Sequence, residues 1–461
     1  MSNQFSALST QHIDKKNAMR LLMQLPKHLK NPLVTGTLLL TITGMLSKVI
    51  GFFYRIFLSR TIGAEGMGIY QLIFPIFSLG LVITAAGIQT AISKYVSSCC
   101  CREASGYGMG YLYAGLFLSV CLSLLVGLPM YHYAGWISDV ILDEPRCLTL
   151  LQIVAYALPF ASIHACINGY YYGQKKTAIP AVTQFAEQCG RVLAVYILLK
   201  IYEQKGIAPT PSIAVWGIVC GEFCSMLISI TCLHFYKTWG GFFHKLKEIA
   251  LFSAPLTANR ITYHVFASAE SILIPLKLKA FGYSSSEALS VFGILNGMAM
   301  PMILFPSTLT NSVSVLLLPT ISEASAQENV RMVRSATRKT IFYCLLLGFA
   351  STAFFLVTGR YIGQYMFHNT LSGSFISTLS WICPFLYLTT TLSSILHGLG
   401  KAGTAFFINL SGCAIRIVCI YLLIPTYGIR IYLYAMLASQ LVAAVCSIYF
   451  VRRSISRSCR L

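Results

Sequence analysis

Three basic residues interrupt an apolar stretch near the start of the chain. Residues 44–60 read GMLSKVIGFFYRIFLSR, in which Lys48, Arg55 and Arg60 are the charged positions. A second apolar stretch carries Arg260. A cation at the centre of a bilayer costs about 2.5–3.5 kcal/mol on insertion scales. Deep cations of this kind suit an anion, because Arg forks and Lys point charges match phosphate or pyrophosphate oxygens.

The three cations of residues 44–60 differ in their expected depth. Lys48 lies deep in the apolar run, and Arg55 follows seven positions later on the same helical face. Arg55 is close enough to the outer end to reach the headgroups, and Arg60 is expected in a loop or at the interface. Gly44 and Gly51 flank Lys48. Since glycine weakens a helix, we predict a hinge that turns Lys48 toward a phosphate.

Other charged residues also fall within apolar runs. We expect them either to couple transport to an ion or to stabilise the structure. Glu187 and Arg191 stand at i,i+4, a spacing at which they can pair. Glu222 or Glu270 could hold a coupling cation, Na⁺ or H⁺; otherwise the membrane potential would supply the drive. The complete group is Glu187, Arg191, Glu222, His264, Glu270 and Arg416.

The composition is that of a polytopic membrane protein. Of the 461 residues 56% are apolar and only 10% are charged, whereas a soluble domain carries about 25% charged residues. The net charge of +20 does not indicate nucleic-acid binding, because the basic residues are scattered through short loops. Residues 1–33 are polar and basic, so no cleavable signal peptide is expected.

Twelve apolar segments are long enough to cross a bilayer, which takes about 20 helical residues. We expect spans at 34–58, 67–94, 108–131, 148–170, 178–199, 212–235, 249–275, 289–318, 340–358, 374–396, 404–424 and 431–450. The fold class is therefore an all-α membrane protein. Its expected parts are a basic N-terminal tail (1–33), an N-lobe (34–236), a C-lobe (237–450) and a basic C-terminal tail (451–461).

The basic residues predict the orientation. Of the 34 Lys and Arg residues, five lie within the expected spans, eight lie in loops on one side, and the remaining 21 lie on the other side with both chain ends. Cytosolic loops carry the excess of Lys and Arg, so both termini are expected in the cytosol. The acidic residues Asp139, Asp143 and Glu144 fall on the outer side.

Part of the chain repeats after six spans. The segments that start at Leu158 and Cys383 align without a gap, with Pro159 matching Pro384 and Arg191 matching Arg416. A shift of six spans preserves orientation, so the two lobes are parallel. Internal repeats with a site between the halves are typical of secondary transporters.

Metal and enzyme chemistry have little support. Most of the 16 cysteines lie in apolar runs, where a free thiol behaves as a small hydrophobe. Cys220 and Cys224 stand at i,i+4, and residues 99–101 are all cysteine, but neither group offers the four ligands of a zinc site. No acid/base pair, nucleophile motif or nucleotide-binding loop is found. We expect neither a metal site nor an enzyme.

Residues 36–96 and 268–324 resemble the stage V sporulation protein B family. This family is the polysaccharide-export branch of the multidrug/oligosaccharidyl-lipid/polysaccharide flippase superfamily. The resemblance implies a V-shaped pair of six-helix lobes in the bacterial cytoplasmic membrane, opening alternately to each side. It also implies a lipid-linked glycan as substrate, such as the undecaprenyl-pyrophosphate precursor of peptidoglycan.

The lipid II flippases of this superfamily carry basic residues in span 1. The stretch SKVIGFFYRIFLSRTIGA matches that pattern at Lys48 and Arg60. Arg55 stands one place after the relatives' middle cation, where this chain has Tyr54.

Two features depart from these relatives. They use an arginine in span 8, but this chain has no Lys or Arg between Lys279 and Arg331. Arg260 is the expected replacement. Many relatives also have two more C-terminal helices that cradle the lipid tail, and only twelve spans are expected here.

The sequence therefore predicts a flippase that acts as a monomer and binds a pyrophosphate through Lys48, Arg55 and Arg260. A cation-coupled multidrug antiporter of the same fold remains an alternative, and would depend on the three acids. A third alternative is a membrane scaffold that recruits cell-wall synthesis proteins through the cytosolic loop 320–339.

Overall fold

The structure is a computed structural model that describes residues 32–100, 105–233 and 240–458. Every regular element in these ranges is a helix. Most of the predicted N-terminal tail, residues 1–31, and the last residues of the C-terminal tail, 459–461, lie outside the described residues. Residues 451–458 continue the last helix, so that part of the predicted tail is helical.

The helices follow one another with short connections. The first half of the chain contains α2 (Pro32–Leu81), η2 (Val82–Ala86), α3 (Gly87–Cys100), α4 (Ser105–His132), α5 (Ala134–Trp136), η3 (Ile137–Ile141), α6 (Cys147–Ala155), α7 (Ala157–Gly173), α8 (Ala178–Gln204) and α9 (Ser212–Thr231). The second half contains α10 (Phe242–Phe281), α11 (Ser285–Gly293), η4 (Ile294–Ala299), α12 (Met300–Leu304), α13 (Ser307–Ala326), α14 (Val330–Tyr361), η5 (Ile362–Met366), α15 (Thr370–Leu379), η6 (Ser380–Ile382), α16 (Cys383–Gly398), α17 (Ala402–Tyr427) and α18 (Ile429–Ser458).

Helices occupy all twelve predicted spans. Within the described residues, nine helices are long and apolar enough to cross a membrane, and one of them, Ile42–Cys99, contains both spans 1 and 2. No loop separates these two spans. They meet at a kink in α2 at Gly63, a single residue with a non-helical backbone and φ 72°. Only glycine adopts that conformation without strain. Helices α8 and α10 are not among the nine, so the count of twelve stays a prediction.

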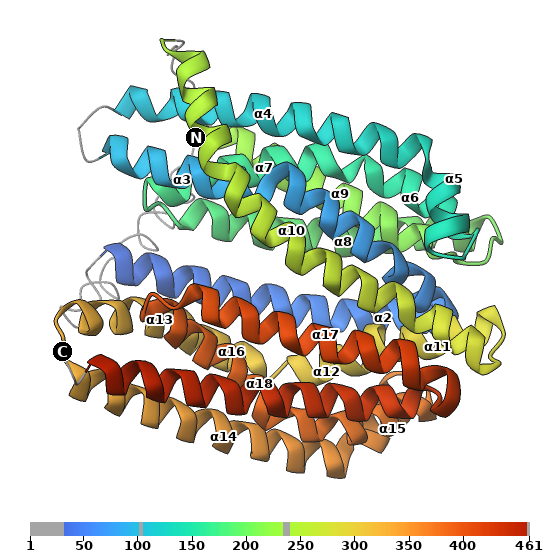
Figure 1. Cartoon of the computed structure of the whole chain (residues 1–461). Helices are drawn as coiled ribbons and strands as arrows, with labels where there is room; N and C mark the ends of the chain where they lie inside the picture. The colour runs from blue at the N-terminus through green and yellow to red at the C-terminus, as the bar shows by residue number, and fades with distance from the viewer. Residues whose placement is uncertain (1–31, 101–104, 234–239, 459–461) are drawn as a thin grey trace, which may run out of the picture.

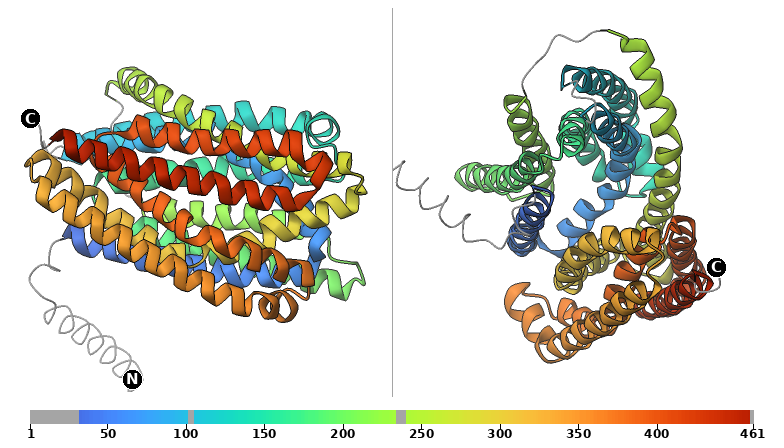
Figure 2. Two further views of the ribbon diagram at one scale, coloured as in Figure 1. Left: turned by 60° about the horizontal axis from the view of Figure 1, so that its bottom comes forward. Right: turned by 90° about the vertical axis from the view of Figure 1, so that its left-hand side faces the viewer.

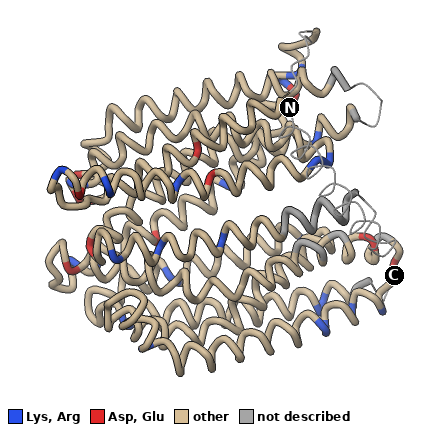
Figure 3. Tube along the Cα trace, turned by 180° about the vertical axis from the view of Figure 1, so that it is seen from behind, with Lys and Arg blue, Asp and Glu red and all other residues tan. Residues whose placement is uncertain are grey.

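The connections between helices alternate between two ends of the bundle (Figure 1). We call the end with connections 133–146, 205–211 and 282–284 the outer end, after the predicted orientation, and the opposite end the inner end. Charged residues gather at both ends, and few lie between them (Figure 3). Such a distribution is expected of a bundle whose middle lies in hydrocarbon. Which end faces the cytosol stays a prediction.

Three clusters of buried apolar side chains hold the helices together. The largest joins both halves of the chain toward the outer end and includes Leu58, Leu151 and Leu289. A second, around Ile92, joins the first half to the inner part of α10, and a third, around Leu392, belongs to the second half. The halves therefore share a core at the outer end, whereas toward the inner end α10 packs into the core of the first half and the other helices of the second half have a core of their own.

Helix α10 connects the two halves along one side of the bundle (Figure 2). It packs on α3 and α4 of the first half and on α17 of the second half. Its inner part contacts the first half through Thr257, which lies against Gly87. Its outer part contacts the second half through Glu270, which pairs with Arg416. The predicted boundary between the lobes thus falls just before a helix that both halves share.

Two glycines allow α2 and α11 to cross closely at the outer end. A Cβ atom on Gly68 would collide with the carbonyl oxygen of Leu289. A Cβ atom on Gly293 would collide with the carbonyl oxygen of Ala64 and with Gly68. The obstacles are backbone atoms, which cannot move aside as a side chain can. This contact between the halves therefore requires glycine at both positions.

We expect Gly68→Ala to open the outer end. The added methyl group separates α2 from α11, and overpacking of a close contact typically costs about 1–3 kcal/mol. The measurement is the distance between spin labels on unnatural residues at Ile207 and Thr370, which lie at the outer ends of the two halves. The control is Gly44→Ala, since a Cβ atom there meets nothing within 4 Å. Identical distance distributions for both variants would contradict the prediction.

Ionic contacts also join the halves at the outer end. Glu144, just before α6, binds Arg146 and accepts a hydrogen bond of 2.8 Å from Ser285 at the start of α11. Lys279 of α10 lies 2.9 Å from the carboxylate of Asp143. These contacts hold the connection before α6 against the second half.

Arg60 adds a further contact at this end. Its side chain donates hydrogen bonds of 2.7 and 2.6 Å to the carbonyl oxygens of Met366 and Tyr365 at the end of η5. The exposed position agrees with the prediction that Arg60 lies outside the apolar core. Its partners are protein carbonyls of the other half of the chain.

The contact at Glu144 predicts a pH dependence. Burial raises the pKa of Glu144, but hydrogen bonds from Arg146 and Ser285 outweigh this and hold the pKa below its usual value. The ionised carboxylate therefore stabilises the closed outer end at neutral pH. This stabilisation is lost as the pH falls through the lowered pKa, below the ordinary glutamate range near about 4.3.

Acidification is therefore expected to lengthen the distance between labels at Ile207 and Thr370. Glu144→Gln should do the same at neutral pH, with a shift in population of about fivefold, since partly exposed pairs contribute about 1 kcal/mol or less. Asp139→Asn is the control, because its carboxylate contacts the neighbouring Ser138. A distance in Glu144→Gln that equals the wild-type distance at neutral pH would rule the contact out.

Candidate functional site

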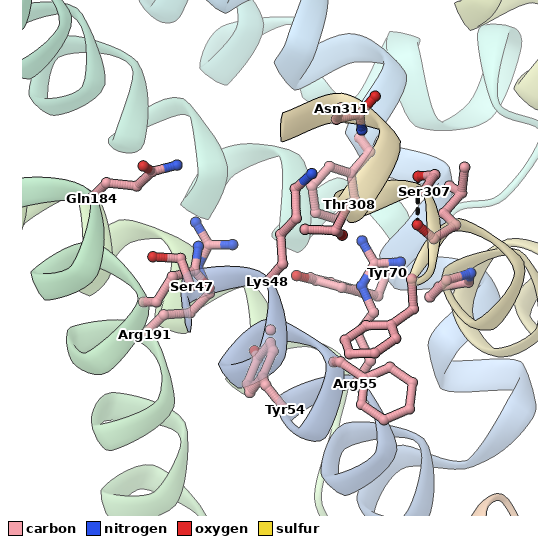
Figure 4. Close-up of a pocket in the computed structure, with 17 residues that line it drawn as sticks. Ser47, Lys48, Tyr54, Arg55, Tyr70, Gln184, Arg191, Ser307, Thr308 and Asn311 are labelled. Carbon is pink, nitrogen blue, oxygen red and sulfur yellow. Dashed lines mark hydrogen bonds between the residues drawn. The ribbon is translucent and has the colours of Figure 1, made fainter. Parts of the chain in front are cut away.

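A pocket of about 420 Å³ lies between the two halves of the chain, beside the first part of α2 (Figure 4). Helices α2 and α8 form one side, and α12 with the start of α13 forms the other. The lining residues are Ser47, Lys48, Gly51, Phe52, Tyr54, Arg55, Tyr70, Phe74, Gln184, Gln188, Arg191, Pro301, Leu304, Phe305, Ser307, Thr308 and Asn311. The pocket is thus at the position that the internal repeat predicts for a transport site.

The charges that line the pocket are all positive. Lys48 lies at its centre and points toward Thr308 and Asn311 of α13 (Figure 4). Arg55 and Arg191 complete the set, and no Asp or Glu is among the lining residues. Lys48 and Arg55 are on one face of α2, as their spacing predicts. Within the described part of the chain, neither has a carboxylate within ion-pair distance.

Several polar atoms of the pocket lack a partner. Of the described residues, eight have a buried side-chain oxygen or nitrogen without a hydrogen bond, and four of these line the pocket: Ser47 Oγ, Tyr54 Oη, Arg191 Nε and Thr308 Oγ1. The Tyr54 hydroxyl lies near that of Tyr70 without a hydrogen bond of normal geometry. Unpaired buried donors cost about 1–3 kcal/mol each. They indicate a pocket built to receive acceptor atoms.

Arg260 is not part of this pocket, contrary to the prediction. Its guanidinium donates hydrogen bonds to the carbonyl oxygen of Ala86 at 2.7 Å and to Thr90 Oγ1 at 3.3 Å. Ala86 ends the π-helical segment η2, where the regular helical hydrogen bonds are interrupted. Arg260 therefore packs α10 against that segment. His264, one turn later, is half-buried beside Tyr263 and does not line the pocket either.

Arg191 supplies the third cation in place of Arg260. Its Nη2 donates to Glu187 one turn earlier on α8, as the i,i+4 spacing predicts. Its side chain lines the pocket, and its Nε is buried without a partner. Span 8, which lacks a cation, contributes the neutral groups Thr308 and Asn311. An arginine already paired on one edge can still bind an anion with its free N–H.

Glu222 and Glu187 lie close together behind this arginine. Both belong to a group with His164. In this group a ring nitrogen of His164 and one carboxylate oxygen of each glutamate lie within 4.8 Å of one another. His164 of α7 and Glu222 of α9 are buried, and Glu187 of α8 is half-buried. Sequence reasoning missed His164, although a histidine and Asn168 at i,i+4 in an apolar span were a usable signal.

Glu270 and Arg416 form a separate pair in the second half. Arg416 Nε and Nη2 donate to the two carboxylate oxygens of Glu270 at 2.6 and 2.9 Å, and Tyr432 donates to Glu270 at 2.7 Å. Arg416 also contacts Ser439. Both carboxylate oxygens are therefore occupied. For Glu270 and Arg416 the sequence predicted either a coupling or a structural role, and this arrangement supports the structural one.

The repeated arginines find different acids. Arg191 pairs within its own helix, whereas Arg416 pairs with α10. The repeat aligns Arg191 with Arg416 but does not align their acidic partners. The two positions are therefore equivalent in the backbone and different in their chemistry.

The predicted hinge does not coincide with the break in α2. The helix is regular through Gly44 and Gly51, and the non-helical residue is Gly63. A Cβ atom on Gly51 would lie 3.6 Å from Gln188 Oε1 and one on Gly44 would meet nothing within 4 Å. A Cβ atom at either position would thus be accommodated, and a bend at either position in another state stays a prediction.

Two family models match the chain. The model described as polysaccharide biosynthesis protein matches residues 33–325, and the MatE model matches residues 278–422. Among curated proteins, stage V sporulation protein B of Bacillus subtilis is 27% identical over 412 residues, which are 87% of this chain and 80% of that protein. The lipid II flippase MurJ of Bacillus subtilis is 21% identical over 85% of this chain and 77% of its own.

Solved structures share the fold. A lipid II flippase MurJ in an inward closed conformation aligns with a TM-score of 0.69 at 16% identity, over 91% of this chain and 90% of that chain. An inward-facing multidrug resistance MATE family transporter aligns with a TM-score of 0.67 at 15% identity, over 90% and 96%. At these identities the alignments establish a fold and leave the pocket chemistry to be argued from its own residues.

Proposed function

Because this chain belongs to the polysaccharide biosynthesis protein family, a branch of the multidrug/oligosaccharidyl-lipid/polysaccharide flippase superfamily, we propose that it is a flippase for a lipid-linked glycan. The substrate is a pyrophosphate-linked cell-wall precursor or oligosaccharide, translocated across the bacterial cytoplasmic membrane by alternating access. The observation that carries this proposal is the pocket between the halves, whose charged lining residues are Lys48, Arg55 and Arg191.

The pocket chemistry supports a pyrophosphate headgroup. Lys48 offers a point charge, and Arg55 and Arg191 offer planar donors that match phosphate oxygens. Ser47 and Thr308 add hydroxyl donors on opposite walls. The glycan would lie in the aqueous space between the halves, while the lipid tail stays in the bilayer. The tight contact at the outer end supports a state that opens toward the inner end.

Reconstitution tests the proposal directly. Purified protein in liposomes is supplied with fluorescent lipid-linked pyrophosphoryl oligosaccharide, and reduction of the label from outside measures translocation. We expect translocation by the wild type and none by empty liposomes. Protein that is folded by its melting profile and yet gives no translocation would overturn the proposal.

The same liposomes separate the two alternatives. A cation-coupled drug antiporter would accumulate a cationic dye in exchange for protons or sodium and would tolerate loss of Lys48. The cation-lined pocket disfavours a cationic substrate, because like charges repel across a low-dielectric site. A scaffold for wall-synthesis proteins would leave both assays silent and would depend on residues 320–339 instead.

A further inference from the structure

A buried titratable cluster lies directly behind the anion pocket. His164 and Glu222 are each only 8% exposed, and His164 Nδ1 lies 3.5 Å from a carboxylate oxygen of Glu222. On its other edge, His164 Nε2 lies 2.6 Å from the side-chain nitrogen of Asn168. Glu187 completes the cluster from α8. Two carboxylates this close in an apolar bundle repel each other unless a cation or a proton intervenes.

The hydrogen bonds determine which group has room for a proton. The Thr183 hydroxyl lies 3.2 Å from Asn168 Oδ1, 3.1 Å from the carbonyl oxygen of Pro180 and 3.3 Å from His164 Nε2. With its Oδ1 beside this hydroxyl, Asn168 presents its amide nitrogen, a donor, to His164 Nε2. His164 therefore accepts at Nε2 and carries its hydrogen on Nδ1, facing Glu222. A second proton on this imidazole would place two donors against each other. Glu187 already has its charge compensated by Arg191, so the remaining acceptor for a proton is the carboxylate of Glu222.

Arg191 connects this cluster to the pocket. Its guanidinium binds Glu187 through Nη2, its Nε has no partner, and its side chain lines the pocket. Four helices place titratable or charged groups close enough to interact electrostatically with Arg191 and the cluster. These groups are His164 of α7, Glu187 of α8, Glu222 of α9, and Tyr54, Arg55 and Tyr70 of α2. An anion that binds Arg191 offsets part of its positive charge. The arginine then stabilises the negative charges of the two glutamates less.

The net charge of the site changes sign when the substrate binds. Lys48, Arg55 and Arg191 supply three positive charges, and Glu187 and Glu222 supply two negative charges, which leaves one positive charge in the empty site. A doubly negative pyrophosphate diester turns this into one negative charge. One proton on Glu222 then makes the closed, loaded site neutral. A net charge in the membrane interior costs several kcal/mol, so the loaded site favours the proton.

We propose that Glu222 is a proton-binding site linked to the anion pocket through Glu187 and Arg191, so that substrate binding and proton uptake favour each other. This inference rests on the proposed function and adds its coupling. The proton comes from water on the side to which the pocket is open and moves onto Glu222 without any bond to substrate. The empty site returns with one positive charge, and an inside-negative membrane potential favours that inward step.

Glu270, another buried acid among the described residues, does not suit this role. Both oxygens of Glu270 accept from Arg416 and one also accepts from Tyr432, so its charge is neutralised in place. A divalent metal at His164, Glu187 and Glu222 would have to share Glu187 with the guanidinium of Arg191, whose positive charge repels it. The geometry therefore points to a proton.

Binding in lipid nanodiscs at several pH values tests the linkage. The probe is a pyrophosphoryl sugar diester with a short prenyl chain, whose charge is constant between about pH 5 and pH 8, the range in which linked groups are examined. Wild-type affinity is expected to rise as the pH falls, by up to about tenfold per pH unit for one linked proton. A pH indicator in weakly buffered solution should register proton uptake when the probe binds.

Glu222→Gln is expected to bind the probe with an affinity independent of pH and without proton uptake. The matched control is Glu203→Gln, since Glu203 is an exposed glutamate on α8 paired with Lys200. His164→Asn is the second variant if Glu222→Gln fails to fold, and it should change the pH dependence because it removes the donor that faces Glu222. A Glu222→Gln protein with the wild-type pH dependence and proton uptake would overturn the inference.

Infrared difference spectra without ligand separate this inference from the proposed function. Between acidic and neutral pH the wild type should show a carboxyl band that is absent in Glu222→Gln and present in Glu203→Gln. Failure of the wild type to bind the probe, with this band intact, would overturn the flippase proposal and leave the proton site. Absence of the band in the wild type would overturn the proton site.

Discussion

Replacing Lys48 with alanine is expected to weaken binding of a lipid-linked pyrophosphate by about ten- to a hundredfold and to slow its translocation to a similar extent. Lys48 is at the centre of the pocket, and no ion-pair partner for it lies in the described residues. Its charge is therefore free for the substrate. A hydrogen bond to a charged group is worth about 1.5–3 kcal/mol. Binding to nanodiscs and translocation in liposomes measure the two effects.

Lys48→Arg and Arg260→Ala are the informative controls. Lys48→Arg keeps the positive charge and should retain most of the affinity. Arg260 is engaged with Ala86 and Thr90 outside the pocket, so Arg260→Ala should leave the affinity close to the wild-type value. Loss of binding in Arg260→Ala that matches the loss in Lys48→Ala would contradict the assignment of the pocket.

Replacing Arg416 with alanine is expected to give the largest loss of stability, about 3–5 kcal/mol. The substitution leaves the carboxylate of Glu270 buried without its bidentate partner, with only the hydroxyl of Tyr432 to bind it. The side chains of Glu270 and Arg416 are 11% and 14% exposed, so water does little to compensate. Thermal unfolding in detergent, followed by size exclusion of the remaining monodisperse protein, measures the effect.

Removing both charges should restore much of that stability. Arg416→Met combined with Glu270→Leu replaces the ion pair by apolar groups of similar length, a change that is often neutral or stabilising in buried sites. Lys200→Ala is the control, because its pair with Glu203 is exposed. A double variant as unstable as Arg416→Ala would show that the arginine acts through something other than charge compensation.

The sequence predicted the helical membrane class and the family, and both are confirmed. Local properties carry this information, since apolar runs of sufficient length define spans whatever their neighbours are. The i,i+4 pair of Glu187 and Arg191 and the shared face of Lys48 and Arg55 were also predictable, because a regular helix fixes those relations.

The membership of the pocket was less predictable. Tyr54, Gln184 and Gln188 line it and were not singled out, because polar uncharged residues are common in spans and carry a weak signal. Arg260 looked equivalent to Lys48 from its depth in span 7, yet it packs against η2. Arg260 binds the irregular backbone at Ala86, and no sequence pattern predicts that this π-helical segment forms there.

The sequence by itself determined that this chain crosses a membrane in repeated apolar helices and that cations lie deep within them. Hydrophobicity and helical spacing are properties of single segments, so no tertiary information was needed. Only the tertiary structure decided that Arg191 belongs with Lys48 and Arg55, that Arg416 neutralises Glu270, and that His164 and Glu222 meet behind the pocket. The rotation and the neighbours of each helix follow from packing across long distances in the chain, and those set which charges face one another.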